Sequence, residues 1–379
     1  MSYFFSSRLF KCLCNKDKMG AMEKVFSVTL QSGKITDVYF AKDIKDLSSQ
    51  LSSYSQNALW VFDTNTAPLF KNLPPNRVVL ESGEKNKNLK SIERIISAAL
   101  DYHLARDSYF IAFGGGVVCD MTALASSLYM RGTKLVLVPT TLLCMVDASV
   151  GGKTAIDYAG AKNLIGTFNP AQDVLISCDT LRTLSESEYI SGLGEVLKHA
   201  LLSKDEELYN FLVKEKDKIL SRDRDVVSQM VKLSIEVKNF YIESDPEEKK
   251  GIRSALNLGH TFAHALESIT HFTGLSHGKA VAWGCGRALD ISYELGLIDN
   301  DFYTKANNLF NMYPFDMDYR VGRGEWLEFQ DAISKDKKRM SGSVKFVLLE
   351  GFGKPVLKQL DMKLVQRTVI SGPAKSNNK

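Results

Sequence analysis

The stretch that decides the fold is YFIAFGGGVVCD, residues 109–120, which is followed by LVLVPTT at residues 135–141. A short apolar run leads directly into three glycines, and a helical pattern then extends to about residue 129. A strand, a glycine turn and a helix in this order present backbone N–H groups and a helix N-terminus to a phosphate. The spacing is not GxGxxG, so the turn predicts a close approach to an anion without identifying a dinucleotide. A purely structural glycine turn stays open as an alternative.

Apolar runs of strand length occur on both sides of this turn and alternate with helical patterns. The expected strands cover residues 25–30, 58–64, 78–80, 109–113, 135–139 and 174–177, with a further short strand from about residue 35. Strands that alternate with helices predict an α/β domain with a mainly parallel sheet. Thr140 and Thr141 then follow the carboxyl end of a strand, where ligands bind in sheets of this kind.

The character of the sequence changes near residue 181. Helical patterns cover residues 186–202, 206–220 and 225–241, and the next strand pattern is VKFVLL at residues 344–349. We therefore expect a second, mainly α-helical domain. The expected organisation is a disordered leader at 1–22, an α/β domain at 23–184, a helical domain at 185–370 and a disordered tail at 371–379.

Composition places the chain among soluble globular proteins. Its 379 residues are 44% hydrophobic and 24% charged, which is ordinary for that class. A net charge of +4 gives no case for nucleic acid or an acidic membrane as partner, and no apolar run is long enough to span a bilayer. The six cysteines are scattered without a CxxC pair, which predicts reduced thiols in a cytoplasmic compartment.

Histidines are few and clustered. Four of the six lie between His260 and His277, and His260 and His264 are spaced i, i+4, so they share one helix face. Two imidazoles with the carboxylate of Glu195 would make the ligand set of a catalytic zinc ion. His277 competes with His264 for the second imidazole, and histidines with a purely structural role stay an alternative.

Basic residues form a second group of candidates. Several stand in glycine-rich or apolar surroundings, where a merely solvated charge is not expected, and they suit a phosphate or carboxylate substrate. They are Arg131, Lys153, Lys162, Lys198, Arg253 and the pair Lys337-Lys338. The charge runs at residues 214–218 and 247–250 are typical of a solvated surface instead.

In combination these motifs resemble the 3-dehydroquinate synthases of the sugar-phosphate cyclase superfamily. The resemblance covers roughly residues 63–353 and rests on motifs that occur in the family's order. They are GGGVVCD, YMRG, VPTTLL, VDASVGGKT, AKNLIGTF, GLGEVLK, RSALNLGHTFAHALE, HGKAVA and SKDKK followed by FVLL. The resemblance implies an N-terminal α/β domain that binds NAD, a helical C-terminal domain, and a divalent metal ion, zinc or cobalt, between them. It also implies a cytoplasmic homodimer of the shikimate pathway.

The implied reaction converts 3-deoxy-D-arabino-heptulosonate 7-phosphate into 3-dehydroquinate and phosphate. Transient oxidation of a ring hydroxyl acidifies the neighbouring C–H, and phosphate leaves. The ketone is then reduced back, the ring opens, and an intramolecular aldol reaction closes the carbocycle. NAD is regenerated in each turnover and behaves as a catalytic cofactor.

The resemblance also assigns roles to individual residues. The metal ligands are Glu195, His260 and His277. The residues that contact substrate are Asp147, Lys153, Asn163, Lys198, Arg253, Asn257, His264 and Lys338, joined by Arg131 from a neighbouring subunit. The residues that contact the cofactor are Asp63, Asn65, Glu84, Lys87, Gly115, Gly116, Asp120, Thr140, Thr141, Lys162, Thr180 and Thr183.

The chain departs from the family pattern at a few positions. Cys119 replaces a usual glycine, Asp157 an asparagine and Gly194 an alanine, and the segment between Lys238 and Arg253 is one residue longer. The alternatives are a sister cyclase that makes valiolone or deoxy-inosose precursors, a metal-dependent alcohol or glycerol dehydrogenase, and a binding protein without activity. VGGKT and AKN favour the dehydroquinate pattern, whereas GTFNP and Cys119 lean slightly towards the sister cyclases.

Overall fold

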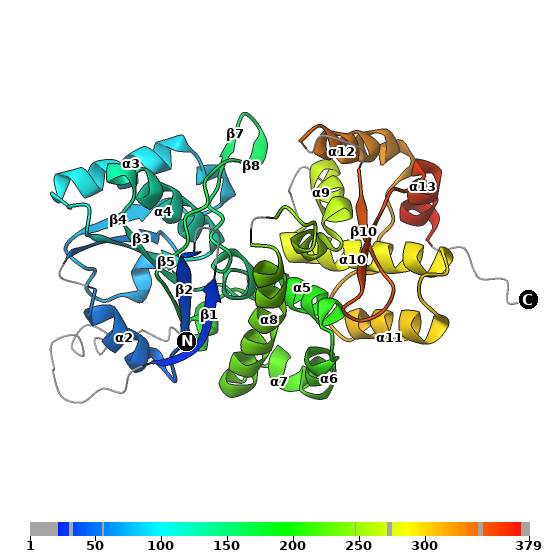
Figure 1. Cartoon of the computed structure of the whole chain (residues 1–379), viewed down its shortest axis with the longest axis horizontal. Coiled ribbons are helices and arrows are strands. Elements are labelled where there is room, and N and C mark those ends of the chain that lie inside the picture. The colour runs from blue at the N-terminus through cyan, green and yellow to red at the C-terminus, as the bar shows by residue number, and fades with distance from the viewer. Residues whose placement is uncertain are drawn as a thin grey trace, which may run out of the picture. The chain divides into compact units, whose positions relative to one another are not determined.

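A computed structural model describes residues 22–29, 33–54, 57–246, 248–270, 275–339 and 344–372, with side chains except at 335–339 (Figure 1). The chain divides into two compact units, residues 1–184 and 185–379. The expected leader and tail lie outside the described residues, apart from Met22, Ser371 and Gly372. No helix in the described ranges is both long and apolar enough to cross a membrane.

The first unit is built on a seven-stranded sheet with the order β1-β2-β9-β6-β5-β3-β4. Its strands are β1 (Glu23–Thr29), β2 (Ile35–Phe40), β3 (Ala58–Asp63), β4 (Arg77–Leu80), β5 (Tyr109–Gly114), β6 (Lys134–Pro139) and β9 (Asp173–Ile176). β1 pairs antiparallel with β2, and every other neighbouring pair is parallel. The predicted α/β class with a mainly parallel sheet is therefore confirmed.

Both faces of this sheet are covered, which explains why its strands read as continuous apolar runs. Trp60 and Phe62 face a cluster that includes the buried Leu47 and Leu51 of α2 (Ile44–Ser52). Figure 1 shows α3 (Leu89–Asp101) and α4 (Gly116–Leu128) on the other side of the sheet, and α4 packs against β5.

Short elements connect the strands of this unit. The 3₁₀ or π turns are η3 (Ala67–Leu69), η4 (Glu84–Asn86), η5 (Tyr129–Arg131), η6 (Cys144–Ala148) and η7 (Cys178–Thr183). A separate antiparallel hairpin consists of β7 (Ile156–Tyr158) and β8 (Ala161–Ile165). Neither this hairpin nor α2 is predicted by a pattern in the sequence, because both are short and only partly apolar.

The second unit is mainly helical, as predicted. Its helices are α5 (Glu186–Leu202), α6 (Glu207–Lys214), α7 (Lys216–Leu220), α8 (Arg224–Ser244), α9 (His260–Ile269), α10 (His277–Glu294), α11 (Asn300–Asn311), α12 (Trp326–Arg339) and α13 (Met362–Ser371). Two 3₁₀ turns, η8 (Arg253–Asn257) and η9 (Arg323–Glu325), and a hairpin of β10 (Phe346–Leu349) and β11 (Pro355–Lys358) complete it. One prediction is wrong: the helix expected at residues 206–220 is interrupted at Glu215, whose φ of −101° and ψ of 15° lie outside the helical region.

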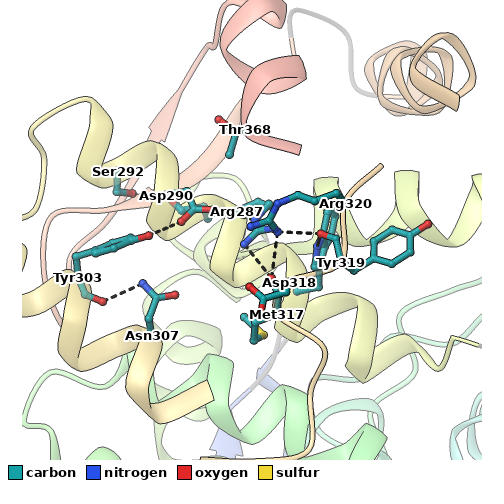
Figure 2. A network of polar contacts seen from close by, with 12 residues as sticks. Arg287, Asp290, Ser292, Tyr303, Asn307, Met317, Asp318, Tyr319, Arg320 and Thr368 are labelled. Carbon is teal, nitrogen blue, oxygen red and sulfur yellow. Dashed lines mark hydrogen bonds and ion pairs between the residues drawn. The ribbon is translucent and has the colours of Figure 1, made fainter. Parts of the chain in front are cut away.

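Helix α10 is the centre of the second unit and packs against α5, α9, α11, α13 and β10. A network of polar contacts lies inside this core (Figure 2). Arg287 Nε lies 2.9 Å from Asp290 Oδ2, and Tyr303 Oη of α11 donates to Asp290 Oδ1 over 2.7 Å. Arg287 Nη2 also donates to the carbonyl of Met317. The bond from Tyr303 to Asp290 therefore connects α11 to the buried ion pair of α10.

Candidate active site

Three potential metal ligands meet inside the second unit. Glu195 lies in the middle of α5, and His260 and His277 are the first residues of α9 and α10. Each offers one ligand atom, and these atoms lie within 4.8 Å of one another. Glu195 Oε1 is 3.5 Å from His260 Nε2 and 3.4 Å from His277 Nε2, and Glu195 is fully buried.

The second nitrogen of each imidazole has its own partner. His260 Nδ1 lies 3.2 Å from the carbonyl oxygen of Leu258, and His277 Nδ1 lies 3.3 Å from Glu267 Oε1. Such partners fix the tautomer and the ring orientation of metal-binding histidines. Both Nε2 atoms are therefore directed to the same carboxylate oxygen of Glu195.

A lysine adds charge to this group. Lys198 Nζ lies 2.5 Å from Glu195 Oε2 and donates to the carbonyl of Leu256 over 2.8 Å. Burial opposes ionisation of Glu195, but Lys198 and the histidines outweigh it and hold the pKa of this carboxyl well below its usual range. Glu195 is therefore an anion that can bind a cation.

The histidines differ in charge because their surroundings differ. Burial, reinforced by Lys198, lowers the pKa of His260 to about 3, so this imidazole is neutral. Burial also opposes protonation of His277, but Glu195 and Glu267 outweigh it and raise the pKa of His277 to about 10. The site stabilises positive charge between these carboxylates, and a divalent metal ion would supply that charge. One carboxylate and two imidazoles, with a further coordination position open, fit catalytic zinc.

Most of the cofactor residues predicted in the first unit follow strands at one edge of its sheet, whereas Lys162 lies in β8 of the separate hairpin. β3, β4, β5, β6 and β9 are parallel, so their carboxyl ends lie together. Gly115 is the N-cap of α4, and Thr140 N donates to the carbonyl of Gly114 over 2.9 Å. A Cβ atom at Gly115 would lie 3.0 Å from Thr141 Cγ2, so glycine permits this close approach. The N-terminus of α4 therefore opens at the sheet edge where a phosphate can bind.

Lys87 joins two groups of predicted site residues. Its Nζ lies 2.7 Å from Asp120 Oδ2 and donates to Asn163 Oδ1 over 2.6 Å, and Lys87 is buried. Burial disfavours the charge, but Asp120 and Glu84 outweigh it and raise the pKa of Lys87. Lys87 is therefore a cation shared between Asp120 of α4 and Asn163 of the β7–β8 hairpin.

The hairpin is held against Lys87 by backbone bonds as well. Asp157 N donates to the carbonyl of Lys87 over 2.8 Å, and Asn163 N donates to Asp157 Oδ1 over 2.8 Å. Asn163 has a φ of 52°, a left-handed conformation that asparagine tolerates. Asp157, which departs from the family's usual asparagine, keeps the same acceptor oxygen and so can hold Asn163 in this conformation.

Two family models match this chain in sequence. The model described as 3-dehydroquinate synthase N-terminal matches residues 77–191, and the model described as 3-dehydroquinate synthase C-terminal matches residues 192–339. The chain belongs to the 3-dehydroquinate synthase family. The resemblance stated from the sequence motifs is thereby confirmed.

Relatives and solved structures agree with this family. A 3-dehydroquinate synthase from Francisella tularensis subsp. tularensis is 40% identical over 288 residues, which cover 76% of this chain and 79% of the relative. A 2-epi-5-epi-valiolone synthase from Streptomyces hygroscopicus subsp. jinggangensis, solved with NAD+ and Zn2+, has 22% identity and a TM-score of 0.77 over 92% of this chain and 99% of its own. A 2-deoxy-scyllo-inosose synthase, solved with carbaglucose-6-phosphate, NAD+ and Co2+, has 21% identity and a TM-score of 0.80 with the same coverage. At these identities the two structures show a shared fold.

The structure brings together the three ligands that the 3-dehydroquinate synthase resemblance implies. The i, i+4 pair on α9 does not supply both imidazoles of this group. The ring of His264 lies 5.6 Å from that of His260 and is exposed, whereas the three-residue group contains His277. The role of these residues as ligands stays a prediction.

The residues predicted to contact substrate lie in both units. Arg253 is buried at the start of η8, and Asn257 is exposed at its end. Asp147 lies in η6, and Lys153 forms an isolated backbone bridge with Phe168. The side chain of Lys338 lies outside the described residues.

Several predicted cofactor residues also stabilise turns at the sheet edge. Asp63 Oδ1 accepts from the backbone N–H groups of Asn65 and Thr66. The hydroxyl group of Thr180 donates to the carbonyl of Ser177, which precedes η7, and that of Thr183 donates to the carbonyl of Thr180. These residues therefore set the shape of the edge, whatever they contact in addition.

Two residues that orient members of the site, Glu267 and Asp157, are not among the predicted site residues. Glu267, the partner of His277, lies seven residues after His260, which places it two helical turns along α9. That spacing is a signal the sequence offers. Asp157 was noted only as a departure, because its contact with the Asn163 backbone depends on the hairpin turn.

Proposed function

We propose that this chain converts 3-deoxy-D-arabino-heptulosonate 7-phosphate into 3-dehydroquinate and phosphate in the cytoplasm. The observation that carries the proposal is the Glu195, His260 and His277 group with Lys198 beside it, inside a family match that runs from residue 77 to 339. Every charged residue that the family pattern requires is present in the sequence. The 40% identical relative carries the name of this activity, whereas the valiolone and inosose synthases are only 22% and 21% identical.

Glu195, His260 and His277 would hold the metal ion, zinc or cobalt. A bound divalent cation supplies a Lewis acid that stabilises negative charge on a substrate oxygen. Lys198 and Arg253, both buried and cationic, would bind the carboxylate and the developing oxyanion of the sugar. His264 is exposed beside the metal group, so its imidazole can accept or return a proton during elimination and ring opening.

NAD would bind at the carboxyl edge of the parallel sheet, with its diphosphate at the N-terminus of α4. Bound there, it supplies a hydride acceptor that is regenerated within each turnover. The backbone N–H groups after Gly115, together with Thr140 and Thr141, suit the diphosphate. The two sister cyclases whose fold this chain shares were solved with NAD+ bound.

We also propose that the enzyme is a homodimer in which Arg131 reaches the phosphate bound by the other subunit. Met130 and Arg131 have φ angles of 49° and 63°, and consecutive left-handed residues of this kind are strained and concentrate at functional sites. Leu128, Met130 and Phe168 are exposed. Phe168 lies near the other two in the fold, because the neighbouring Thr167 hydroxyl donates a hydrogen bond to Ser127 Oγ. A second copy would cover this apolar set. Sedimentation equilibrium gives the oligomeric state, and a monomer would contradict the assignment of Arg131.

Phosphate release tests the reaction. Purified protein with the heptulosonate phosphate, NAD and zinc should release phosphate and form dehydroquinate without net NADH. No phosphate release would overturn the proposal. Turnover of sedoheptulose 7-phosphate would instead indicate a sister cyclase, and NADH accumulation with glycerol would indicate a dehydrogenase.

Elemental analysis tests the ligand assignment separately. Glu195→Ala and His277→Ala should lose bound metal, because each removes one of three protein ligands. His264→Ala is the matched control and should retain stoichiometric metal. Loss of metal in His264→Ala with retention in His277→Ala would show that the i, i+4 pair binds the ion.

A further inference from the structure

A single carboxylate organises the loop that leads into the substrate residues of η8. Asp245, the residue after α8, is only 1% exposed. Its Oδ1 accepts from the backbone N–H groups of Lys249 and Lys250 over 2.9 and 3.0 Å. Its Oδ2 accepts from those of Ile252 and Arg253 over 3.0 and 3.3 Å. Four backbone donors of one loop thus converge on one side chain.

These four hydrogen bonds to one side chain stabilise the shape of the loop, which is neither helix nor strand. Hydrogen bonds to a charged acceptor are about twice as strong as neutral ones. Burial alone would raise the pKa of Asp245, but the four backbone donors outweigh it and lower the pKa. Glu248 and Gly251, with φ angles of 56° and 76°, supply the left-handed turns that wrap the chain around the carboxylate.

The loop connects directly to the residues expected to bind substrate. Arg253, whose own N–H is held by Asp245, is the first residue of η8, and Asn257 is the last. The carbonyl of Leu256 accepts from Lys198 Nζ, and that same Nζ lies 2.5 Å from Glu195 Oε2. A shift of the loop therefore moves Arg253 and the acceptor that holds Lys198 beside the metal group.

We propose that Asp245 is a positioning residue for substrate binding, which sets the place of Arg253 and Asn257 by holding the backbone of residues 249–253. This inference rests on the proposed function, since it requires that η8 contacts the sugar phosphate.

Three variants test the inference. Asp245→Ala removes all four acceptor contacts, and Asp245→Asn keeps one acceptor oxygen of the same shape. Asp223→Ala is the matched control, because Asp223 caps the other end of α8 by accepting from Asp225 N and Val226 N. Its loss should lower thermal stability without touching η8.

Hydrogen exchange and steady-state kinetics provide the two readouts. The amides of residues 249, 250, 252 and 253 should exchange faster in Asp245→Ala than in wild type, and Asp245→Asn should be intermediate. The KM for the heptulosonate phosphate should rise about tenfold or more in Asp245→Ala, with a smaller change in kcat and partial recovery in Asp245→Asn. Asp223→Ala should keep the wild-type KM.

The outcomes separate this inference from the proposed function. An active wild type whose KM is unchanged in Asp245→Ala, despite faster exchange of the loop amides, would overturn the positioning role. An equal rise of KM in Asp223→Ala would also overturn it, because general destabilisation would then explain the effect. A wild type that releases no phosphate would overturn the proposed function itself, whatever the amides show.

Discussion

Replacing Gly278 with alanine should separate the two helices that carry the proposed metal ligands Glu195 and His277. Gly278 follows His277 on α10, and a Cβ atom there would lie 1.6 Å from the carbonyl oxygen of Ser191 on α5. A carbon atom and a carbonyl oxygen approach no closer than about 3.3 Å, so the two backbones would have to open by about 1.7 Å. The N–H of Gly278 also donates to Ser191 Oγ over 3.1 Å, and this bond would break.

The opening of about 1.7 Å can be compared with the variation in metal–ligand distance that a metal site allows. Metal–ligand distances are met within about 0.2 Å, so an opening of α5 from α10 should weaken zinc binding at least about tenfold. Overpacking of this kind costs about 1–3 kcal/mol. For a unit of this size, that cost should lower Tm by about 2–12 °C. Competition with a chelating dye measures the affinity, and thermal unfolding with and without zinc measures the stability.

Gly324→Ala provides the control, because a Cβ atom at Gly324 meets nothing within 4 Å. That variant should keep the zinc affinity and the Tm of the wild type. If Gly278→Ala also kept both, the close approach of α5 and α10 would not determine the geometry of Glu195 and His277. An equal loss in both variants would show that the effect does not come from the contact between Gly278 and Ser191.

Three further predictions concern single side chains. Glu267→Gln should weaken zinc binding about 10–100-fold while the fold is retained, because His277 loses its charged partner. A zinc affinity equal to that of wild type, measured by competition with a chelator, would contradict this. Lys87→Met should lower the free energy of unfolding of the first unit by about 3 kcal/mol, since Asp120 keeps a mostly buried charge without its cation. A urea unfolding midpoint equal to that of wild type would refute this prediction. The pKa of Asp245 is lowered in the folded state, so its ionised carboxylate stabilises the fold fully when the pH is above the unfolded-state pKa of about 3.9. This contribution is lost as the pH falls through the folded-state pKa. The difference in free energy of unfolding between wild type and Asp245→Asn, measured by urea unfolding, should therefore be larger at pH 7 than near pH 3. An equal difference at both pH values would contradict the assignment.

Much of the fold could be predicted from the sequence, because the strands and the long helices carry strong patterns. The helix predicted at residues 186–202 agrees with α5, and the apolar runs around Gly115 agree with β5 and β6. The break at Glu215 could not be predicted, since lysine and glutamate favour helix and no glycine or proline stands between residues 207 and 220.

The candidate site could be predicted less completely. Spacing alone pointed to His260 and His264, and only the family resemblance selected His277, because sequence distance does not show which helix starts lie together. The contact between Lys87 and Asn163 joins residues 76 positions apart. The four hydrogen bonds from backbone N–H groups to Asp245 depend on the conformation of a loop, and a loop has no periodic pattern that would indicate them in the sequence.

The bond from Lys87 to Asn163 joins a proposed cofactor residue to a proposed substrate residue. The Lys87 ammonium can donate three hydrogen bonds, and Asp120 and Asn163 lie within reach of two of them. If a cofactor group replaces Asn163 as a partner of Lys87, the Asn163 side chain becomes available to the sugar. Cofactor and sugar would then affect each other's affinity by the same factor, because linkage is reciprocal in free energy.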